Sequence, residues 1–463
     1  MVKNYIDKVE KEMVQKLCEL TAIPSVYDPE GCKPGQPFGE HVAQALEYVL
    51  DLARELGFQT RNYDGYAGEI TVGSGSRMIG ILCHTDVVSP GEGWDTPAFS
   101  PVIKDGKIYA RGASDDKGPI IGALYGLRYL EQEGLIPKDT CIRMIVGTDE
   151  EEGWQCIRHY LDRVDTLPAA SIVPDGNFPL IYCEKGLLDF DLIWEGQPDR
   201  NAGIQLVSLK GGRSRNIVAD EARCVLKCEN PQAVLESLDL PEQVEGSVKE
   251  GFLTLKGTGI SAHCMTPEKG FNAVACLLET LWQLKDSLSH GAFMEDFHQA
   301  FGMDTAGEKL GCAMADEAGA LTFNPGTVSL EEDGRIRFCS NIRYPASAEY
   351  DEVTNLLRRQ LKKHHFIYEE IDHLPPICHK TDSPLVTGLM EAYREVTGDC
   401  KSQPLAIGGA TYARALPNAI AFGPLFPWEE ELAHEANEFM AVDSLKKMTE
   451  ILICGLQKMM EIC

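Results

Sequence analysis

The chain of 463 residues has no long apolar run, and its first residues are polar. No window offers about 18 consecutive apolar residues, so the sequence predicts no membrane span. Residues 1–13 carry repeated charges and show no apolar core of a signal peptide. We therefore expect a cytoplasmic protein with no membrane partner.

Positive charge is scarce. Against 71 Asp and Glu residues stand 43 Lys and Arg residues, which gives a formal net charge of −28. Such a surface repels phosphate backbones, so we expect no nucleic-acid partner. The composition, with 44% hydrophobic and 25% charged residues, is typical of a soluble globular protein and excludes a disordered or fibrous chain. Some of the surplus carboxylates are available to hold cations.

No two cysteines lie closer in the sequence than Cys224 and Cys228. The 16 cysteines are scattered without a CxxC motif, and several lie in apolar runs, as Cys83, Cys276 and Cys339 do. This usage is typical of reduced, buried thiols in a cytoplasmic protein and not of a disulfide framework.

Hydrophobic periodicity predicts alternating helices and strands in the first part of the chain. Apolar residues recur at steps of three and four in three segments that we expect to be helical, 6–20, 42–56 and 121–130. Short continuous apolar runs predict strands buried on both faces at 78–83, 141–147 and 170–173. This alternation predicts an α/β domain whose sheet is largely parallel, with helices on both faces.

The pattern changes after residues 184–186. From there to about residue 378, strands such as 251–255 and 335–341 alternate apolar and polar residues, which indicates an α+β domain with one sheet face in solvent. The first pattern then returns, with a helix, a strand and a second helix expected at 386–396, 419–422 and 442–460. We expect a discontinuous domain, 1–185 and 379–463, interrupted by an inserted domain, 186–378.

Acidic residues and histidines follow the predicted strands, where open α/β sheets bind ligands. His84 and Asp86 come directly after the first apolar run. Residues two apart in an extended segment share a face, so Asp86 can orient the imidazole of His84. Taken alone, the pair is also compatible with a plain turn.

Three further clusters have both structural and chemical interpretations. Either Asp115 or Asp116 can cap the helix that follows, but two aspartates exceed what a cap requires, so one can bridge metal ions. Glu150 and Glu151 belong either to a solvated acidic loop or to a site in which one binds metal and the other is a free base. Asp175 fits a Pro-Asp-Gly turn equally well.

Taken together, the clusters favour the metal-binding interpretation, because successive strands bring them to one edge of the sheet. Two metal ions need about five ligands, one of them shared, plus water. Two histidines with several carboxylates suit zinc or manganese rather than calcium. The set that meets this need comprises His84, Asp115, Glu151, Asp175 and His434.

The motifs resemble those of the dinuclear zinc metallopeptidases, a family that includes aminoacylases, carboxypeptidase G and succinyl-diaminopimelate desuccinylase. The similarity spans nearly the whole chain and is greatest to the monomeric PepV-type dipeptidases. The motifs that carry it are HTDVV at 84–88, RGASDDKGP at 111–119, GTDEE at 147–151, PDGNFP at 174–179, GGATYAR at 408–414 and AHEANE at 433–438.

The resemblance implies a phosphorylase/hydrolase-like catalytic domain and assigns roles to its residues. It implies two Zn²⁺ ions per chain, with Mn²⁺ as the alternative. Asp115 would bridge the two ions. Glu151 and His434 would complete one site, and His84 and Asp175 the other.

The same resemblance implies the catalytic groups. Glu150 would be the general base and Asp86 the helper of the metal-bound histidine. The inserted domain would be a lid. Its proposed substrate-binding residues are Asn216 in SRNIVAD, His263 in HCMTP and Arg343 in SNIRYP, with His263 also reaching the scissile carbonyl.

One departure from the family lies in the GGATYAR stretch, where many relatives have a third glycine in place of Ala410. The backbone there, including Gly409, touches substrate in the family, so the departure bears on specificity. A large lid of this type also implies a monomer.

The expected activity is metal-dependent hydrolysis of dipeptides into free amino acids, with a small peptide as the substrate. An N-acyl-amino-acid deacylase or desuccinylase would use the same metal site and stays open as an alternative. A non-catalytic binding protein on this fold is the other alternative, although such a protein should lack the base or a ligand, and every one of them is present here.

Overall fold

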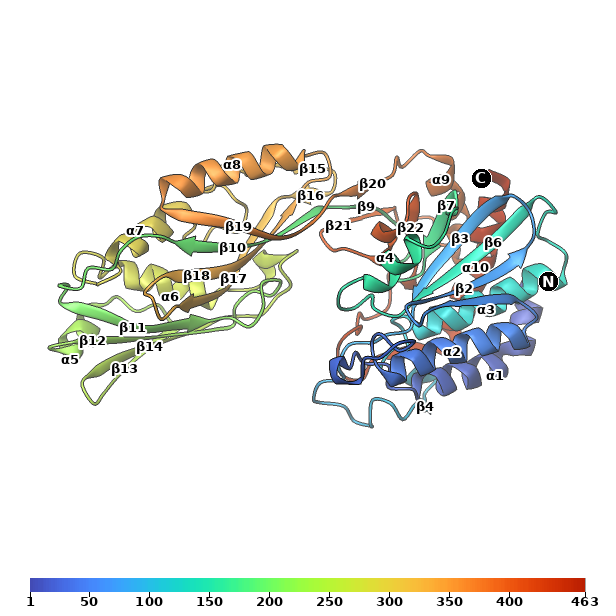
Figure 1. Ribbon diagram of the computed structural model, residues 1–463, viewed down its shortest axis with the longest axis horizontal. Coiled ribbons are helices and arrows are strands. Elements are labelled where there is room, and N and C mark those ends of the chain that lie inside the picture. The colour runs from blue at the N-terminus through green and yellow to red at the C-terminus, as the bar shows by residue number, and fades with distance from the viewer. Residues whose placement is uncertain (463) are drawn as a thin grey trace. The chain divides into compact units, whose positions relative to one another are not determined.

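The computed structural model describes residues 1–462, which form two compact units (Figure 1). Unit 1 comprises Met1–Tyr182, His379–Leu405 and Thr411–Cys463. Unit 2 comprises Cys183–Cys378 and the short segment Ala406–Ala410. The sequence places the first boundary at 185/186, whereas the chain leaves unit 1 after Tyr182.

The larger sheet, built mostly from strands of unit 1, has four parallel strands at its centre. Its order is β1-β2-β6-β3-β7-β22-β9-β20, and β21 also pairs with β9. The parallel strands are β6 (Thr140–Gly147), β3 (Arg77–His84), β7 (Ala170–Val173) and β22 (Ala419–Ala421). The outer strands are antiparallel: β1 (Gln59–Tyr63), β2 (Ala67–Gly73), β9 (Ile181–Glu184) and β20 (Ile377–Cys378). The mostly parallel sheet expected from the sequence is therefore its central part.

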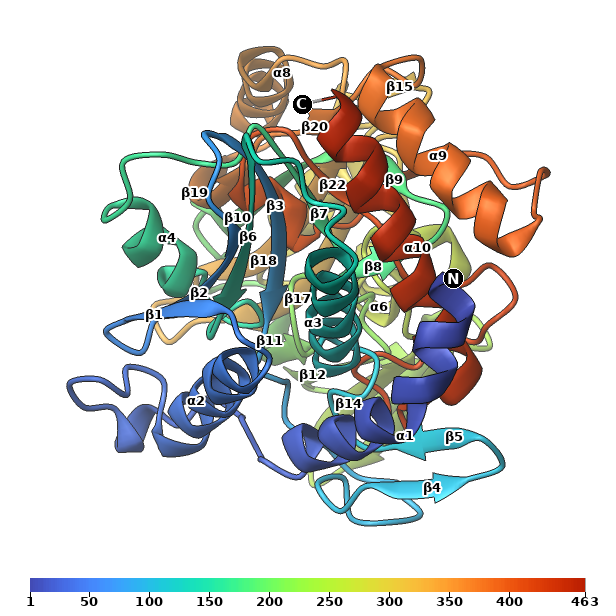
Figure 2. The same cartoon turned by 90° about the vertical axis from the view of Figure 1, so that its right-hand side faces the viewer.

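Helices cover this sheet (Figure 2). They are α1 (Val2–Thr21), α2 (Glu40–Glu55), α3 (Lys117–Gln132), α4 (Gln155–Leu161), α9 (Pro384–Thr397) and α10 (Val442–Ile462). Helices α3 and α10 lie side by side, and α1 packs against both. At their contact a Cβ on Gly122 would lie 2.6 Å from Cε of Met448, so the absence of a side chain on Gly122 permits the close approach of the two helices.

The parallel strands all end at one edge of the sheet. β3 ends at His84, which pairs in register with Gly147 at the end of β6. β7 ends at Val173, immediately before Pro174-Asp175. Parallel pairing therefore delivers three of the acidic or histidine clusters to the same edge, and the register fixes their relative heights.

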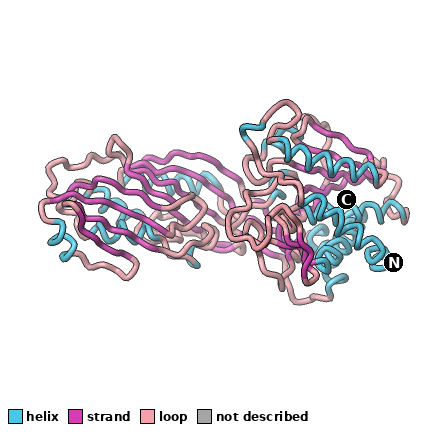
Figure 3. Tube along the Cα trace, turned by 90° about the horizontal axis from the view of Figure 1, so that it is seen from below, coloured by secondary structure: helices cyan, strands magenta, loops and turns pink. Residues whose placement is uncertain are grey.

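Unit 2 is built on an antiparallel sheet in the order β13-β14-β12-β11-β17-β18-β10-β19. Its strands are β10 (Gly186–Trp194), β11 (Ile204–Gly211), β12 (Glu221–Cys228), β13 (Val244–Lys249), β14 (Phe252–Thr258), β17 (Thr322–Leu330), β18 (Ile336–Tyr344) and β19 (Phe366–Leu374). Its helices are α5 (Pro231–Ser237), α6 (Ala273–Trp282), α7 (Gly291–Ala300) and α8 (Tyr350–Lys363). Side chains from α6, α7 and α8 share one hydrophobic core with the sheet, so the helices cover one of its faces (Figure 3).

The expected alternation in unit 2 holds for some strands only. Along β14 buried Leu253 and Leu255 alternate with more exposed neighbours, as a sheet with one wet face requires. β18 alternates only in its first half, because Ser340 and the residues after it are all buried. Polar side chains such as Asn341 and Arg343 are therefore enclosed at the end of this strand.

Short strands and 3₁₀ turns connect the larger elements. The remaining strands are β4 (Val102–Lys104), β5 (Lys107–Tyr109), β8 (Gly176–Asn177), β15 (Ala315–Asp316), β16 (Gly319–Ala320), β21 (Leu405–Ile407), β23 (Pro424–Leu425) and β24 (Phe439–Ala441). The 3₁₀ turns are η1 (Pro29–Gly31), η2 (Pro267–Lys269) and η3 (Tyr412–Ala415). Within residues 1–462, every helix is too short or too polar to span a lipid bilayer.

Gly147, at the end of β6, is a position at this edge where a side chain would clash. A Cβ there would lie 2.2 Å from Oη of Tyr412, a fully buried side chain. We expect Gly147→Ala to lower the free energy of unfolding by about 1–3 kcal/mol, the usual cost of overpacking. Urea denaturation measures it. Gly153→Ala is the matched control, since its Cβ would meet Asp149 at an ordinary 3.6 Å, and an equal loss in both variants would contradict the account.

Candidate metal centre

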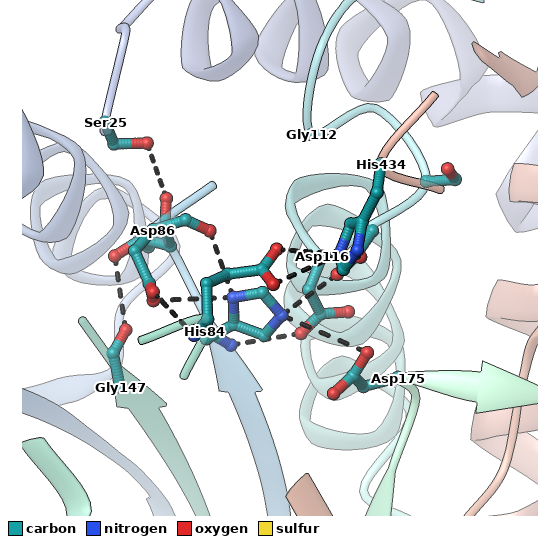
Figure 4. A network of polar contacts seen from close by, with 12 residues as sticks. Ser25, His84, Asp86, Gly112, Asp116, Gly147, Asp175 and His434 are labelled. Atoms are coloured by element: carbon teal, nitrogen blue, oxygen red, sulfur yellow. Dashed lines mark hydrogen bonds and ion pairs between the residues drawn. The ribbon is translucent and has the colours of Figure 1, made fainter. Parts of the chain in front are cut away.

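His84 is held at both ring nitrogens. It is fully buried, and its Nε2 lies 3.0 Å from Oδ1 of Asp115. On the other side, Nδ1 lies 3.0 Å from the carbonyl oxygen of Asp86 (Figure 4). A proton on Nδ1 donated to that carbonyl leaves the Nε2 lone pair directed toward Asp115, which is the tautomer that a metal ligand needs.

The carboxylate of Asp86 contacts both His84 and the backbone of Glu151. Its Oδ1 lies 3.4 Å from Nδ1 of His84, and its Oδ2 accepts a hydrogen bond of 3.0 Å from the backbone N–H of Glu151. Asp86 therefore contacts His84 through both its carbonyl and its carboxylate, and it fixes the start of the acidic loop after β6. The Asp86 carbonyl accepts the hydrogen bond from the ring, and the carboxylate that the sequence assigned to this role lies 3.4 Å from the same nitrogen.

Asp115 lies between the two histidines. Its Oδ1 faces His84 and its Oδ2 lies 3.0 Å from Nε2 of His434. The same Nε2 lies 3.1 Å from the carboxylate of Glu151. One carboxylate with an oxygen toward each imidazole has the shape of a ligand shared by two ions.

Asp175 and Glu150 lie on the His84 side. Oδ1 of Asp175 is 4.0 Å from Nε2 of His84. Ligand atoms of His84, Glu150 and Asp175 lie within 4.8 Å of one another, as do those of His84, Asp115 and Glu151. The structure thus brings the five expected ligands into one cluster, with Glu150 beside them.

A buried ion pair positions this cluster, and sequence reasoning missed it. Glu438 and Arg111 are 0% and 1% exposed, and Nη1 of Arg111 lies 2.7 Å from Oε2 of Glu438. Arg111 also donates to the carbonyl of His434, at 3.0 Å. The sequence did contain a signal, because Glu438 is the last residue of the AHEANE motif. Only His434 of that motif was assigned a role.

Glu438 also accepts hydrogen bonds from the loop that carries the bridging aspartate. The donors are the backbone N–H groups of Gly112, Ser114 and Asp115 and the Ser114 hydroxyl. Because one carboxylate ties this loop to the segment that bears His434, the spacing between the two ligands depends on it.

Asp116 corrects one structural expectation. It occupies the N-cap position of α3, but its side chain makes no capping hydrogen bond. Instead its Oδ2 accepts a 3.1 Å hydrogen bond from the backbone N–H of His84 (Figure 4). Neither aspartate therefore caps α3 with its side chain: Asp115 faces the histidines, and Asp116 binds the end of β3.

The cluster has more negative charge than its own cations balance. Burial and the charge of Asp115 raise the pKa of Glu151 to about 7 and that of Asp175 to about 6. Burial and Asp175 raise the pKa of Glu150 well above its usual range. Hydrogen bonds to Asp115 and Glu151 raise the pKa of His434 to about 11. The carboxylates therefore outnumber the positive partners that the two histidines provide.

This donor set fits divalent metal ions. Four carboxylates and two imidazoles crowd into one region, and imidazole with carboxylate suits zinc or manganese. Cations among them would relieve the repulsion that the carboxylates otherwise impose on one another.

The other expected site residues belong to unit 2. Oδ1 of Asn216 accepts a hydrogen bond from the Ser214 hydroxyl, and Nδ1 of His263 accepts one from the backbone N–H of Met265 at 3.2 Å. Gly409 lies beside Met265, whose Sδ would be 3.6 Å from an added Cβ.

Arg343 is 4% exposed on β18. Its Nε donates to Oδ1 of Asn341 at 3.0 Å, and its Nη2 lies 3.5 Å from the Cys264 thiol. Nη1 is buried without a hydrogen-bond partner in the described part of the chain. A guanidinium that keeps one N–H group unsatisfied is suited to receive an anion.

The Arg111–Glu438 pair yields a test. We expect Glu438→Gln to weaken metal binding about 10–100-fold, because the spacing of Asp115 and His434 loosens, and to cost about 3–5 kcal/mol of stability, because the Arg111 charge stays buried without a counter-charge. Chelator competition measures the metal affinity, and urea denaturation measures the stability. Glu435→Gln, at an exposed position of the same segment, is the control. Wild-type metal affinity in Glu438→Gln would refute the positioning role.

The sequence of this chain is similar to those of known peptidases. Residues 80–458 match the model of peptidase family M20/M25/M40. The chain is 36% identical over 449 residues to "Putative dipeptidase YtjP" of Bacillus subtilis (strain 168), covering 96% of each protein. It is 34% identical over 466 residues to a similarly named protein of Staphylococcus haemolyticus (strain JCSC1435), covering 98% of each.

Solved structures share the fold. Human carnosine dipeptidase 1 superposes with a TM-score of 0.59 at 16% identity, over 99% of this chain and 98% of that one. The dipeptidase Dug1p of Saccharomyces cerevisiae gives 0.58 at 14% identity, over 99% and 98%. The match to the family model covers most of the chain, and the curated relatives match nearly its whole length. This protein therefore belongs to peptidase family M20/M25/M40.

Proposed function

We propose that this protein is a metal-dependent dipeptidase that cleaves a dipeptide into two free amino acids. The observation that carries the proposal is the Asp115 carboxylate, which directs one oxygen toward each of two histidines. Family membership supports a peptidase, and relatives that match over nearly their whole length are named as dipeptidases.

The proposed cofactor is a pair of Zn²⁺ ions, with Mn²⁺ as the alternative. Asp115, Glu151 and His434 would hold one ion, and Asp115, His84 and Asp175 the other. When bound, such ions lower the pKa of a water molecule and polarise a carbonyl group. Asp86 would keep His84 in the required tautomer through the contact to Nδ1.

Glu150 is the proposed general base. It lies beside His84 and Asp175, and its neighbour Glu151 faces His434. In this role the Glu150 carboxylate accepts a proton from the attacking water and delivers it to the leaving amine.

Residues of unit 2 are proposed to bind the substrate. Arg343 would hold the free carboxylate of a short peptide, and its buried, unsatisfied Nη1 supports this. His263, Asn216 and Gly409 would contact the scissile carbonyl region and the backbone of the substrate. The role of unit 2 as a lid over the catalytic domain is part of the same proposal.

Cytoplasmic location and a monomeric state complete the proposal. The described cysteines are free thiols, which is typical of a reducing compartment. The monomer is inferred from the similarity of the inserted domain to the large lids of PepV-type dipeptidases.

We expect Glu150→Gln to lower kcat by about 10²–10⁴-fold, the usual contribution of a general base, while both metal ions stay bound. Steady-state kinetics on the metal-loaded enzyme and elemental analysis provide the two readouts. Glu152→Gln, two positions along the same loop, is the control. Normal turnover would remove Glu150 as the base, and loss of metal would make it a ligand.

His434→Ala is expected to reduce the metal content from two ions per chain to one, because Glu151 and Asp115 alone hold an ion weakly. Elemental analysis after gel filtration gives the stoichiometry. Retention of two ions would refute the ligand assignment.

A substrate panel tests the activity itself. Dipeptides, N-acetyl and N-succinyl amino acids are compared with and without a chelator, and then after metal is restored. We expect hydrolysis of dipeptides, loss with the chelator and recovery with zinc or manganese. Preference for N-acyl substrates would instead identify a deacylase or desuccinylase, and metal binding without any hydrolysis would indicate a binding protein.

A further inference from the structure

Two cysteines face each other where the chain passes between the units. The chain leaves unit 1 between Tyr182 and Cys183, and it returns between Cys378 and His379. Cys183 lies on β9 and Cys378 on β20, and the two are direct partners in the antiparallel ladder. Figure 1 shows β9 and β20 side by side.

The hydrogen-bond pattern of the ladder defines the geometry of this pair. The backbone N–H of His379 donates to the carbonyl of Tyr182 at 2.8 Å. Hydrogen-bonded and non-hydrogen-bonded pairs alternate along an antiparallel ladder, so Cys183 and Cys378 form a non-hydrogen-bonded pair. In such a pair the Cα atoms are about 4.5 Å apart and the side chains stand on the same face, within the span that a disulfide requires.

The two thiols differ in access. Cys183 is 2% exposed, whereas Cys378 is exposed to solvent. Burial and a hydrogen bond with the Cys378 thiol raise the pKa of Cys183. An oxidant in solution therefore reaches the Cys378 thiol first, and the Cys183 thiol is already in contact with the Cys378 thiol.

We propose that Cys183 and Cys378 form a reversible redox modification site, whose oxidant is a low-molecular-weight disulfide. The Cys378 thiolate attacks one sulfur of the oxidant, the oxidant's S–S bond breaks, and one thiolate leaves. The Cys183 thiolate then attacks Cys378 Sγ and releases the second thiolate. The protein loses two electrons and two protons, and the oxidant is reduced to two thiols.

The disulfide would covalently link the first and last residues of the inserted segment Cys183–Cys378. It would close that whole segment into a loop. Closing a long loop restricts the unfolded chain, so oxidation is expected to stabilise the protein. Neither consequence depends on the proposed hydrolytic function.

The test uses the full chain treated with oxidised glutathione, then alkylated and digested. We expect mass spectrometry to find the peptides of Cys183 and Cys378 joined, and separated again by a reductant. Cys183→Ser and Cys378→Ser should abolish the linked pair. Cys400→Ser, at another exposed cysteine, should leave it intact.

The urea midpoint of the oxidised protein gives a second readout. It should rise above that of the reduced protein in the wild type and in Cys400→Ser, and stay unchanged in Cys378→Ser. Separate alkylation of both cysteines after oxidation, a glutathione adduct that persists on Cys378, or a lower urea midpoint on oxidation would each overturn the proposal.

Discussion

The site depends on one carboxylate shared between two imidazoles. Asp115 can face both His84 and His434 only if a loop after β5 and a segment before β24 keep a fixed spacing. Pairing of β5 with β24, extended by the hydrogen bond from the Ala110 N–H to the Glu438 carbonyl, brings the two segments together. The buried pair of Arg111 and Glu438 then fixes their ligand-bearing ends, because Glu438 binds the first loop and Arg111 binds the carbonyl of His434. A buried ion pair is costly, and here both carboxylate oxygens of Glu438 accept hydrogen bonds.

Much of the catalytic unit could be predicted from patterns in the chain. The strand at 170–173 and the helices at either end lie where periodicity placed them, because continuous apolar runs and three- and four-residue steps reflect burial directly. Parallel pairing then implied one common edge. The hydrogen bond that Asp116 accepts from the backbone N–H of His84 was not predicted, since a contact with a distant strand leaves no local sequence signal.

Glu438 was missed for a similar reason. As one acid in an acidic chain it has no distinctive neighbours, and its importance comes from burial and from donors more than three hundred residues away. For the expected substrate-binding residues of unit 2, the sequence supplied the roles but not the surroundings. The resemblance to a known family assigned Arg343 to substrate binding, yet only the structure reveals that its Nη1 is buried with an unsatisfied N–H group.

The most direct test of the central claim is a crystal structure of the protein grown with zinc, with anomalous scattering used to locate the metal. The account predicts two peaks, one beside each oxygen of Asp115, with His84 at one and His434 at the other. A single peak, or metal bound away from Asp115, would contradict it.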